Sequence, residues 1–269
     1  MPRDARQARH LPPPPTHHAA TAEPFPRFGC YCAVTDSTPT APRPDLLRVP
    51  YDDYRALPAI ANSDLSRLRD ALNGRPPRPV TTSAGALGLG TAFHTALLEP
   101  ELYEPGLPGI NDTLIWWMVD GVKLNPQLNQ LLEDGIPEPS CIFTEAVTGT
   151  LCKLRADLIV DQPDQPYTII DFKTTLARDH RYFVEQCSAY EYDRQAAFYS
   201  DALHADRFLL VGVQKVEPFG LFVYEVPVQM LNEGRAKYLR LLKLLQPDAP
   251  VPRAVAGAVR EVRDSLQSE

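Results

Sequence analysis

Two carboxylates and one lysine interrupt two neighbouring apolar stretches of the chain. Asp157 lies in the stretch 154–160, and Asp171 and Lys173 lie in the stretch 168–175. Because side chains alternate across a strand, Asp171 and Lys173 are expected on one face, about 6–7 Å apart along it. A carboxylate and an amine at this spacing can contact one reacting group from two sides.

The segment between the two stretches, 161–166, is rich in turn-forming Asp and Pro and predicts that the stretches pair as a hairpin. Such pairing brings Asp157 alongside Asp171. A buried charge needs a partner, and two neighbouring carboxylates repel each other, so a divalent cation between them would resolve both problems. Taken alone, an Asp at a strand end is more often a turn former, and a Lys in a strand is more often a solvated edge residue.

The composition is that of an ordinary globular protein. The chain has 269 residues, of which 44% are apolar and 23% charged, enough for one large domain. No run approaches the ~20 apolar residues of a membrane span, and the first residues lack the apolar part of a signal peptide, so we expect a cytoplasmic protein with no membrane partner. The five cysteines are scattered and odd in number, which argues against a disulfide framework.

The formal net charge of −7 argues mildly against a nucleic-acid partner but does not exclude one. A metal-dependent nuclease carries carboxylates in its site, and local basic clusters can contact phosphate. Each candidate for that role is, taken singly, more typical of a solvated surface charge. The candidates are Arg67, Arg69, Arg75, Arg78, Lys153, Arg155, Arg178 and Arg181. Zinc is disfavoured, because Cys30 and Cys32 near His17 and His18 match no usual zinc spacing.

The chain divides into three parts. Residues 1–45 are rich in proline and show no apolar period, which predicts a disordered tail that catalysis does not need. A folded domain is expected over 46–246, and a C-terminal extension over 247–269. One helix is expected to begin at residue 62 or 63. Further helices are expected over 83–99, 126–134, 183–203, 228–245 and 255–266. The expected strands cover 140–144, 151–160, 167–174, 208–213 and 219–226.

Two pairs of residues four apart share helix faces. Gly90 and His94 lie on the helix expected over 83–99, and Gln195 and Tyr199 lie on the one expected over 183–203. A helical Gly costs about 1 kcal/mol relative to Ala, and one reason to keep it is close approach of another backbone. By themselves, the histidine suits a core position and the amide and phenol suit a helix surface.

Five short motifs occur in an order that resembles a known family. They cover 60–63 (Ile-Ala-Asn-Ser), 90–100 (Gly-Thr-Ala-Phe-His through Glu-Pro), 152–157 (Cys-Lys-Leu-Arg-Ala-Asp), 170–175 (Ile-Asp-Phe-Lys-Thr-Thr) and 192–201 (Tyr-Asp-Arg-Gln through Ser-Asp). Over about residues 58–245 the chain resembles the nuclease domain of the phage-type exodeoxyribonuclease VIII (RecE-like) family, within the PD-(D/E)XK superfamily. The resemblance implies an α/β fold with a restriction-endonuclease-like core, in which helices flank a central mixed β-sheet.

The resemblance also assigns roles. It makes His94, Asp157 and Asp171 metal ligands, and it places Asp157, Asp171, Lys173, Gln195 and Tyr199 in the catalytic set. Carboxylate oxygens suit Mg²⁺, and an imidazole ligand also suits Mn²⁺. The chain departs from the commoner family pattern at Ala156, where many relatives have Pro, but that position is not catalytic.

We therefore expect a Mg²⁺-dependent exodeoxyribonuclease that degrades one strand of double-stranded DNA from its end, 5′→3′, in phage-type single-strand-annealing recombination. The resemblance implies a single-strand annealing protein as partner and a ring-shaped homo-oligomer. Two alternatives stay open. One is an endonuclease or nick-processing nuclease on the same fold. The other is a noncatalytic DNA-binding or assembly protein, which the joint presence of Asp157, Asp171 and Lys173 disfavours.

Overall fold

The computed structural model describes residues 43–75, 86–264 and 266 of the chain. The tail expected over 1–45 lies outside the described residues except for its last three positions, and so do Arg78 and the Cys30 and Cys32 pair. Among the helices of the described part, none is long and apolar enough to cross a membrane.

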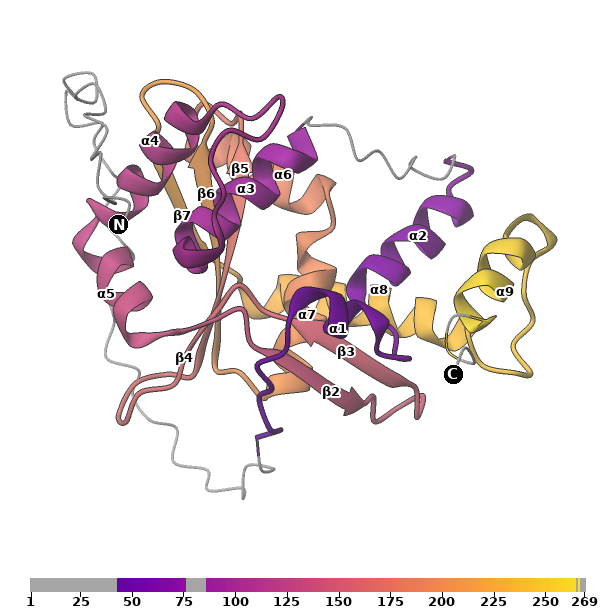
Figure 1. Ribbon diagram of the computed structural model, residues 1–269. Helices are drawn as coiled ribbons and strands as arrows, with labels where there is room; N and C mark the ends of the chain where they lie inside the picture. The colour runs from indigo at the N-terminus through magenta and orange to yellow at the C-terminus, as the bar shows by residue number, and fades with distance from the viewer. Residues whose placement is uncertain (1–42, 76–85, 265, 267–269) are drawn as a thin grey trace, which may run out of the picture.

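A five-stranded mixed sheet forms the centre of the fold (Figure 1). Its strand order is β1-β4-β5-β6-β7. β5 and β6 are parallel, and the other neighbouring pairs are antiparallel. This arrangement confirms the expected α/β class with a central mixed sheet. The strands are β1 (Ile136–Pro137), β4 (Leu158–Val160), β5 (Thr168–Thr175), β6 (Arg207–Gln214) and β7 (Leu221–Glu225).

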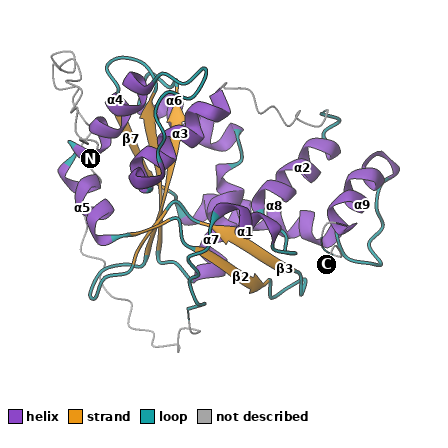
Figure 2. Ribbon diagram, in the orientation of Figure 1, coloured by secondary structure: helices purple, strands orange, loops and turns teal. Residues whose placement is uncertain are grey.

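The prediction of one strand over 151–160 is wrong, because this stretch belongs to two sheets. Its first half is β3 (Leu151–Arg155), which pairs with β2 (Ser140–Thr144) in a separate two-stranded sheet (Figure 2). Its second half is β4, which forms the expected antiparallel pair with β5. The backbone crosses between the sheets at Ala156 and Asp157, where Ala156 N donates to Pro139 O at 3.0 Å. The crossing takes Asp157 out of both strands.

Helices cover both faces of the central sheet (Figure 2). One layer, packed on Ile170 and Phe172 of β5, contains α3, α4 and α5. The opposite core contains Ile169 of β5 with α2, α6, α7, α8 and α9. The helices are α1 (Tyr51–Ala56), α2 (Asn62–Leu72), α3 (Ala86–Leu98), α4 (Asp112–Lys123), α5 (Pro126–Asp134), α6 (His180–Ala189), α7 (Tyr192–Leu203), α8 (Val228–Leu244) and α9 (Ala256–Asp264), with short 3-10 turns at Pro100–Leu102 and Arg253–Val255.

Helix α4 was not expected from the sequence. Its N-cap is Asn111, whose side chain accepts from Leu114 N at 3.3 Å. Its buried side chains Ile115, Met118, Val119 and Val122 pack into the core over one face of the central sheet. The helix therefore depends on the apolar stripe that it buries, as most short helices do.

The single helix expected over 183–203 is also wrong, because the chain breaks at Glu191 into α6 and α7. Glu191 has a left-handed φ of 56°, which ends one helix and starts the next. Its carboxylate lies 3.1 Å from Arg69 Nη1 and 3.3 Å from Arg194 Nε. These two cations, both largely buried, hold the break against α2 and set the direction of α7.

The contact between α7 and α8 is close enough to require glycine at position 234. A Cβ added to Gly234 would lie 2.0 Å from the Asp193 carbonyl oxygen. Overpacked buried sites typically cost 1–3 kcal/mol, so Gly234→Ala should lower the free energy of unfolding by about 2 kcal/mol or more. Thermal denaturation measures the change. Gly257→Ala in α9 is the matched control, because a Cβ there meets nothing within 4 Å. An unchanged Tm for Gly234→Ala would contradict the close approach.

Candidate active site

The edge of β5 beyond residue 170 is where the candidate residues meet. β4 begins at Leu158, opposite Ile170, so within the described residues no strand covers this edge from Asp171 onward. Side chains, instead of a neighbouring strand, form the hydrogen bonds of the Phe172 backbone at this edge. Phe172 N donates to Asp157 Oδ2 at 2.7 Å, and Phe172 O lies 2.9 Å from His94 Nε2. The break between β3 and β4 is what lets the Asp157 carboxylate reach this position.

His94 and Asp157 face each other across this edge. Since a carbonyl oxygen only accepts, the hydrogen on His94 Nε2 points to Phe172 O, and Nδ1 lies 3.4 Å from Asp157 Oδ1. Burial lowers the pKa of His94, but the Asp157 carboxylate outweighs burial and raises that pKa to about 9. Burial likewise opposes ionisation of Asp157, and the facing imidazole holds the pKa of this carboxyl below its usual range. The pair favours a negative Asp157 next to positive charge.

Asp171, Lys173 and Gln195 form a closed set on the other side of β5. Gln195 Nε2 donates to Asp171 Oδ1 at 2.7 Å, and Lys173 Nζ donates to Gln195 Oε1 at 3.0 Å. Lys173 Nζ also lies 2.5 Å from Asp171 Oδ2. The two strand residues therefore share a face, as side-chain alternation predicts, and α7 supplies the amide that links them.

The electrostatics of this set follow from burial. Asp171 is only 1% exposed, and burial raises its pKa to about 6 against the opposing effect of Lys173. For Lys173, burial lowers the pKa, but the Asp171 carboxylate outweighs burial and the pKa is raised. Lys173 is therefore a cation at neutral pH. Tyr199, one turn beyond Gln195 on α7, is also buried, and burial raises its pKa well above the usual range, so it stays a neutral phenol.

A further carboxylate, Glu138, was missed by the sequence reasoning. Each of His94, Glu138 and Asp157 offers a ligand atom within 4.8 Å of the others. Burial raises the pKa of Glu138 to about 7, with the charge of Asp157 acting in the same direction. The β2–β3 register pairs Ser140 with Arg155, and two more steps along the same register place Glu138 opposite Asp157.

These residues fit a divalent cation. The cluster combines one imidazole with the carboxylates of Glu138 and Asp157, and Asp171 lies on the adjacent strand. Asp171 Oδ2 is buried and accepts no hydrogen bond. Its contact with Lys173 Nζ is an ion pair only. Oxygen ligands with one nitrogen ligand suit Mg²⁺ or Mn²⁺. A cation here would offset the repulsion between the carboxylates.

Most of the basic residues suggested as phosphate contacts have structural partners instead. Lys153 Nζ donates to the carbonyl oxygens of Tyr54, Arg55 and Leu57, at the end of α1. Arg155 binds Glu138 and the Val49 carbonyl oxygen. Lys153, Arg155 and the buried Arg69 are therefore not the solvated surface charges that were expected, and their protein partners argue against a phosphate role. Arg67, Arg75 and Arg181 pair with acidic neighbours near the surface, and Arg178 is exposed.

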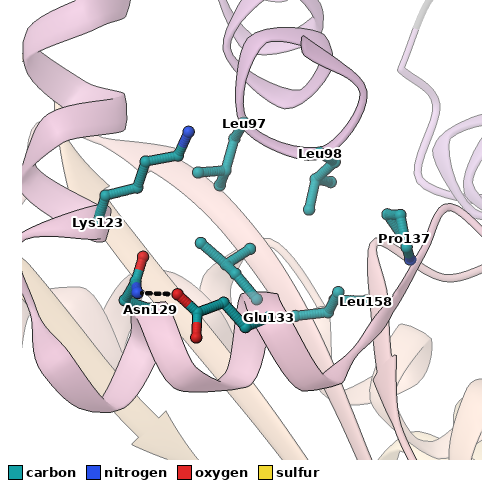
Figure 3. A pocket seen from close by; sticks show the side chains of 8 residues that line it. Leu97, Leu98, Lys123, Asn129, Glu133, Pro137 and Leu158 are labelled. Atoms are coloured by element: carbon teal, nitrogen blue, oxygen red, sulfur yellow. Dashed lines mark hydrogen bonds between the residues drawn. The ribbon is translucent and has the colours of Figure 1, made fainter. Parts of the chain in front are cut away.

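Two hollows lie near the candidate site. The larger, about 320 Å³, lies between α3, α4, α5 and β4; Leu97 and Leu98 of α3 face it, and Asn129 and Glu133 of α5 are hydrogen-bonded on its other side (Figure 3). Its lining contains none of the residues considered above for catalysis or metal binding. The smaller, about 110 Å³, includes Lys173 in its lining and is therefore continuous with the site.

Comparison with known families identifies the class of this protein. Residues 113–247 match the family described as PDDEXK-like domain of unknown function (DUF3799), so the chain belongs to that family. The match includes Asp157, Asp171, Lys173, Gln195 and Tyr199, and it begins after His94. This assignment supports a nuclease. No curated protein matches the chain.

A solved structure shows the same fold. The crystal structure of a protein from Eubacterium rectale, proposed to be an exonuclease, aligns with a TM-score of 0.51 at 15% sequence identity. The alignment covers 74% of this chain and 86% of that one. The structure of SSO0001 aligns over 72% of this chain and 79% of its own, at 18% identity and with a TM-score of 0.34.

Proposed function

We propose that this protein is a divalent-metal-dependent nuclease that hydrolyses phosphodiester bonds of DNA from an end. The observation that carries the proposal is that His94 and Asp157 meet at the Phe172 backbone of β5, while Asp171 of the same strand is close enough to interact with both through its charge. Gln195 holds Lys173 beside Asp171. The family assignment supports it, since the family is PDDEXK-like.

The proposed metal ligands are His94, Asp157 and Asp171, with Glu138 as an additional carboxylate. When bound, Mg²⁺ or Mn²⁺ would lower the pKa of a water and offset negative charge that develops on the phosphate. Lys173 is a cation at neutral pH, so it acts as a point charge toward the attacking water or a nonbridging oxygen and not as a base. Gln195 orients both Lys173 and Asp171. Tyr199 lies on the same face of α7 and interacts with Gln195, so it would help to orient that amide.

An exonuclease is favoured over an endonuclease by the resemblance and by the short connections near the site. Only four residues separate β5 from α6, and six separate β6 from β7. Sequence-specific cleavage needs a segment that reads base edges in the major groove, whereas phosphate contacts ignore sequence. The 5′→3′ polarity, the recombination role, the annealing partner and the ring-shaped oligomer rest on the resemblance alone.

End dependence is tested by comparing two forms of one plasmid under the same Mg²⁺ conditions. The linearised plasmid should be resected progressively to single strands and mononucleotides, because every cut requires an end. The covalently closed circle should survive the same incubation. Rapid linearisation of the closed circle would instead support the endonuclease alternative, and loss of neither form would support a noncatalytic protein.

A further inference from the structure

The smaller hollow, next to Lys173, has a lining unlike that of the larger one. The side chains that define its chemistry are Gln186, Tyr190, Tyr192 and Lys215, which lie beside Lys173. The larger hollow has no aromatic lining residue and includes the carboxylate of Glu133. The smaller one combines the exposed ring of Tyr190 and the half-buried ring of Tyr192 with two cations, which is the chemistry that single-stranded nucleic acid binds.

The two tyrosines form a platform at the C-terminal end of α6 and the start of α7. Their ring centroids lie 5.7 Å apart with a tilt of 40°, and the Tyr190 side of the platform is open, since Tyr190 is 57% exposed. The Tyr192 ring in turn lies 4.8 Å from Lys173 Nζ. A base stacked on the exposed ring would therefore lie close to the proposed catalytic lysine.

Lys215 supplies a second cation to the lining. It follows β6, and its backbone N donates to Thr175 O at 2.9 Å, which fixes it beside the end of β5. Its side chain is half-buried, and within the described ranges no carboxylate forms an ion pair with it. A half-buried cation without a carboxylate favours an anionic ligand such as a phosphate.

The floor of the hollow is rigid. Phe183 lines it and packs on Gly212 of β6, where an added Cβ would lie 2.6 Å from the ring. Gln186 is held by Thr175 Oγ1, which donates to Gln186 Oε1 at 2.7 Å. A rigid floor with fixed polar groups can position a ligand without first being ordered by it.

We propose that this hollow binds an unpaired nucleotide of the DNA strand that is being cut. One base stacks on Tyr190, supported by Tyr192, and Lys215 contacts a phosphate of the same strand. A base stacked on protein cannot remain in the duplex stack, so the end of the duplex is frayed when it reaches Lys173. The inference rests on the proposed function for the identity of the cut strand, but the binding itself does not require catalysis.

Binding is measured with the full-length Asp171→Asn protein in EDTA, so that no DNA is cleaved. The probes are a short oligothymidylate, a duplex with a single-stranded tail that carries 2-aminopurine, and thymidine monophosphate as the free nucleotide. Tyr190→Leu should weaken binding of the oligonucleotide and the tail about tenfold, within the range for loss of one base–aromatic stack. It should also abolish the fluorescence quenching of 2-aminopurine. Tyr190→Phe should bind like the parent, because the ring is what stacks.

Two controls separate this site from general surface effects. Tyr51→Leu removes a tyrosine of nearly equal exposure, 59%, on α1, and should leave binding unchanged. Lys215→Ala should reduce the slope of log Kd against log salt by about 0.7, the value for one phosphate contact on a single strand. Lys123→Ala, which removes an exposed lysine at the larger hollow, should not change the slope.

The outcomes separate the two proposals. Unchanged binding by Tyr190→Leu, or an equal loss in Tyr190→Phe, would overturn the stacking site. Binding of thymidine monophosphate as tight as that of the oligonucleotide would show a product site and overturn the assignment to the DNA strand. The Asp171→Asn protein could bind the tail and lose this binding with Tyr190→Leu, while wild-type protein cuts no DNA. In that case the nuclease proposal fails and the binding site stands.

Discussion

Asp171→Asn is expected to lower kcat on linear duplex DNA by about a thousandfold, the upper range for loss of one preorganised charged or polar group. The substitution is nearly isosteric but removes the charge that would bind the cation and that faces Lys173 Nζ at 2.5 Å. Initial rates with Mg²⁺ measure the effect, and thermal denaturation establishes that the variant is folded.

Asp193→Asn is the matched control for this prediction. Asp193 is as buried as Asp171, at 2% exposed, and its carboxylate also lies 2.5 Å from a lysine, Lys237 Nζ. It lies on the face of α7 that contacts α8, away from β5. Asp193→Asn should therefore keep wild-type kcat, whatever it does to stability. Wild-type turnover by Asp171→Asn, or an equal loss in both variants, would show that Asp171 has no special role.

Lys173→Ala is expected to raise the activation barrier by about 3 kcal/mol, a loss of roughly 150-fold in kcat, by comparison with removal of one preorganised donor. The ammonium is held by Asp171 and Gln195, so its position near the reacting phosphate is fixed before DNA binds. Lys173→Arg keeps the charge but has a planar group of different reach, and should recover little of the loss.

Single-turnover rates at saturating DNA distinguish this effect from weaker binding. Lys237→Ala, which removes the lysine paired with Asp193, is the control and should cut at the wild-type rate. A rate for Lys173→Ala within a few-fold of wild type would mean that the amine is only structural.

The sequence predicted the parts of the site that depend on local periodicity. Alternation along one strand places Asp171 and Lys173 on the same face. The role of Gln195 came only from the family resemblance, and the structure places its amide against both residues. The central mixed sheet was expected from the order of motifs and is confirmed. The position of Asp157 beside β5 was predicted from the turn-rich segment 161–166, which joins β4 to β5.

What the sequence did not predict depends on contacts between distant segments. Glu138 reaches the cluster only because β2 and β3 pair in a second sheet, and the break at Asp157 follows from the same pairing. The division of α6 from α7 at Glu191 depends on Arg69, a residue 122 positions earlier in the chain. Such ion pairs and sheet crossings leave no periodic signal in the sequence.

The proposed nuclease cuts DNA through a divalent cation held at the β5 edge. The most direct test incubates wild-type protein with a linear duplex labelled at one end, in Mg²⁺ and in EDTA. The proposed site predicts release of the label in Mg²⁺, none in EDTA, and recovery when Mg²⁺ or Mn²⁺ is added back. Release that persists in EDTA, or a label that stays on the duplex in every condition, would contradict it.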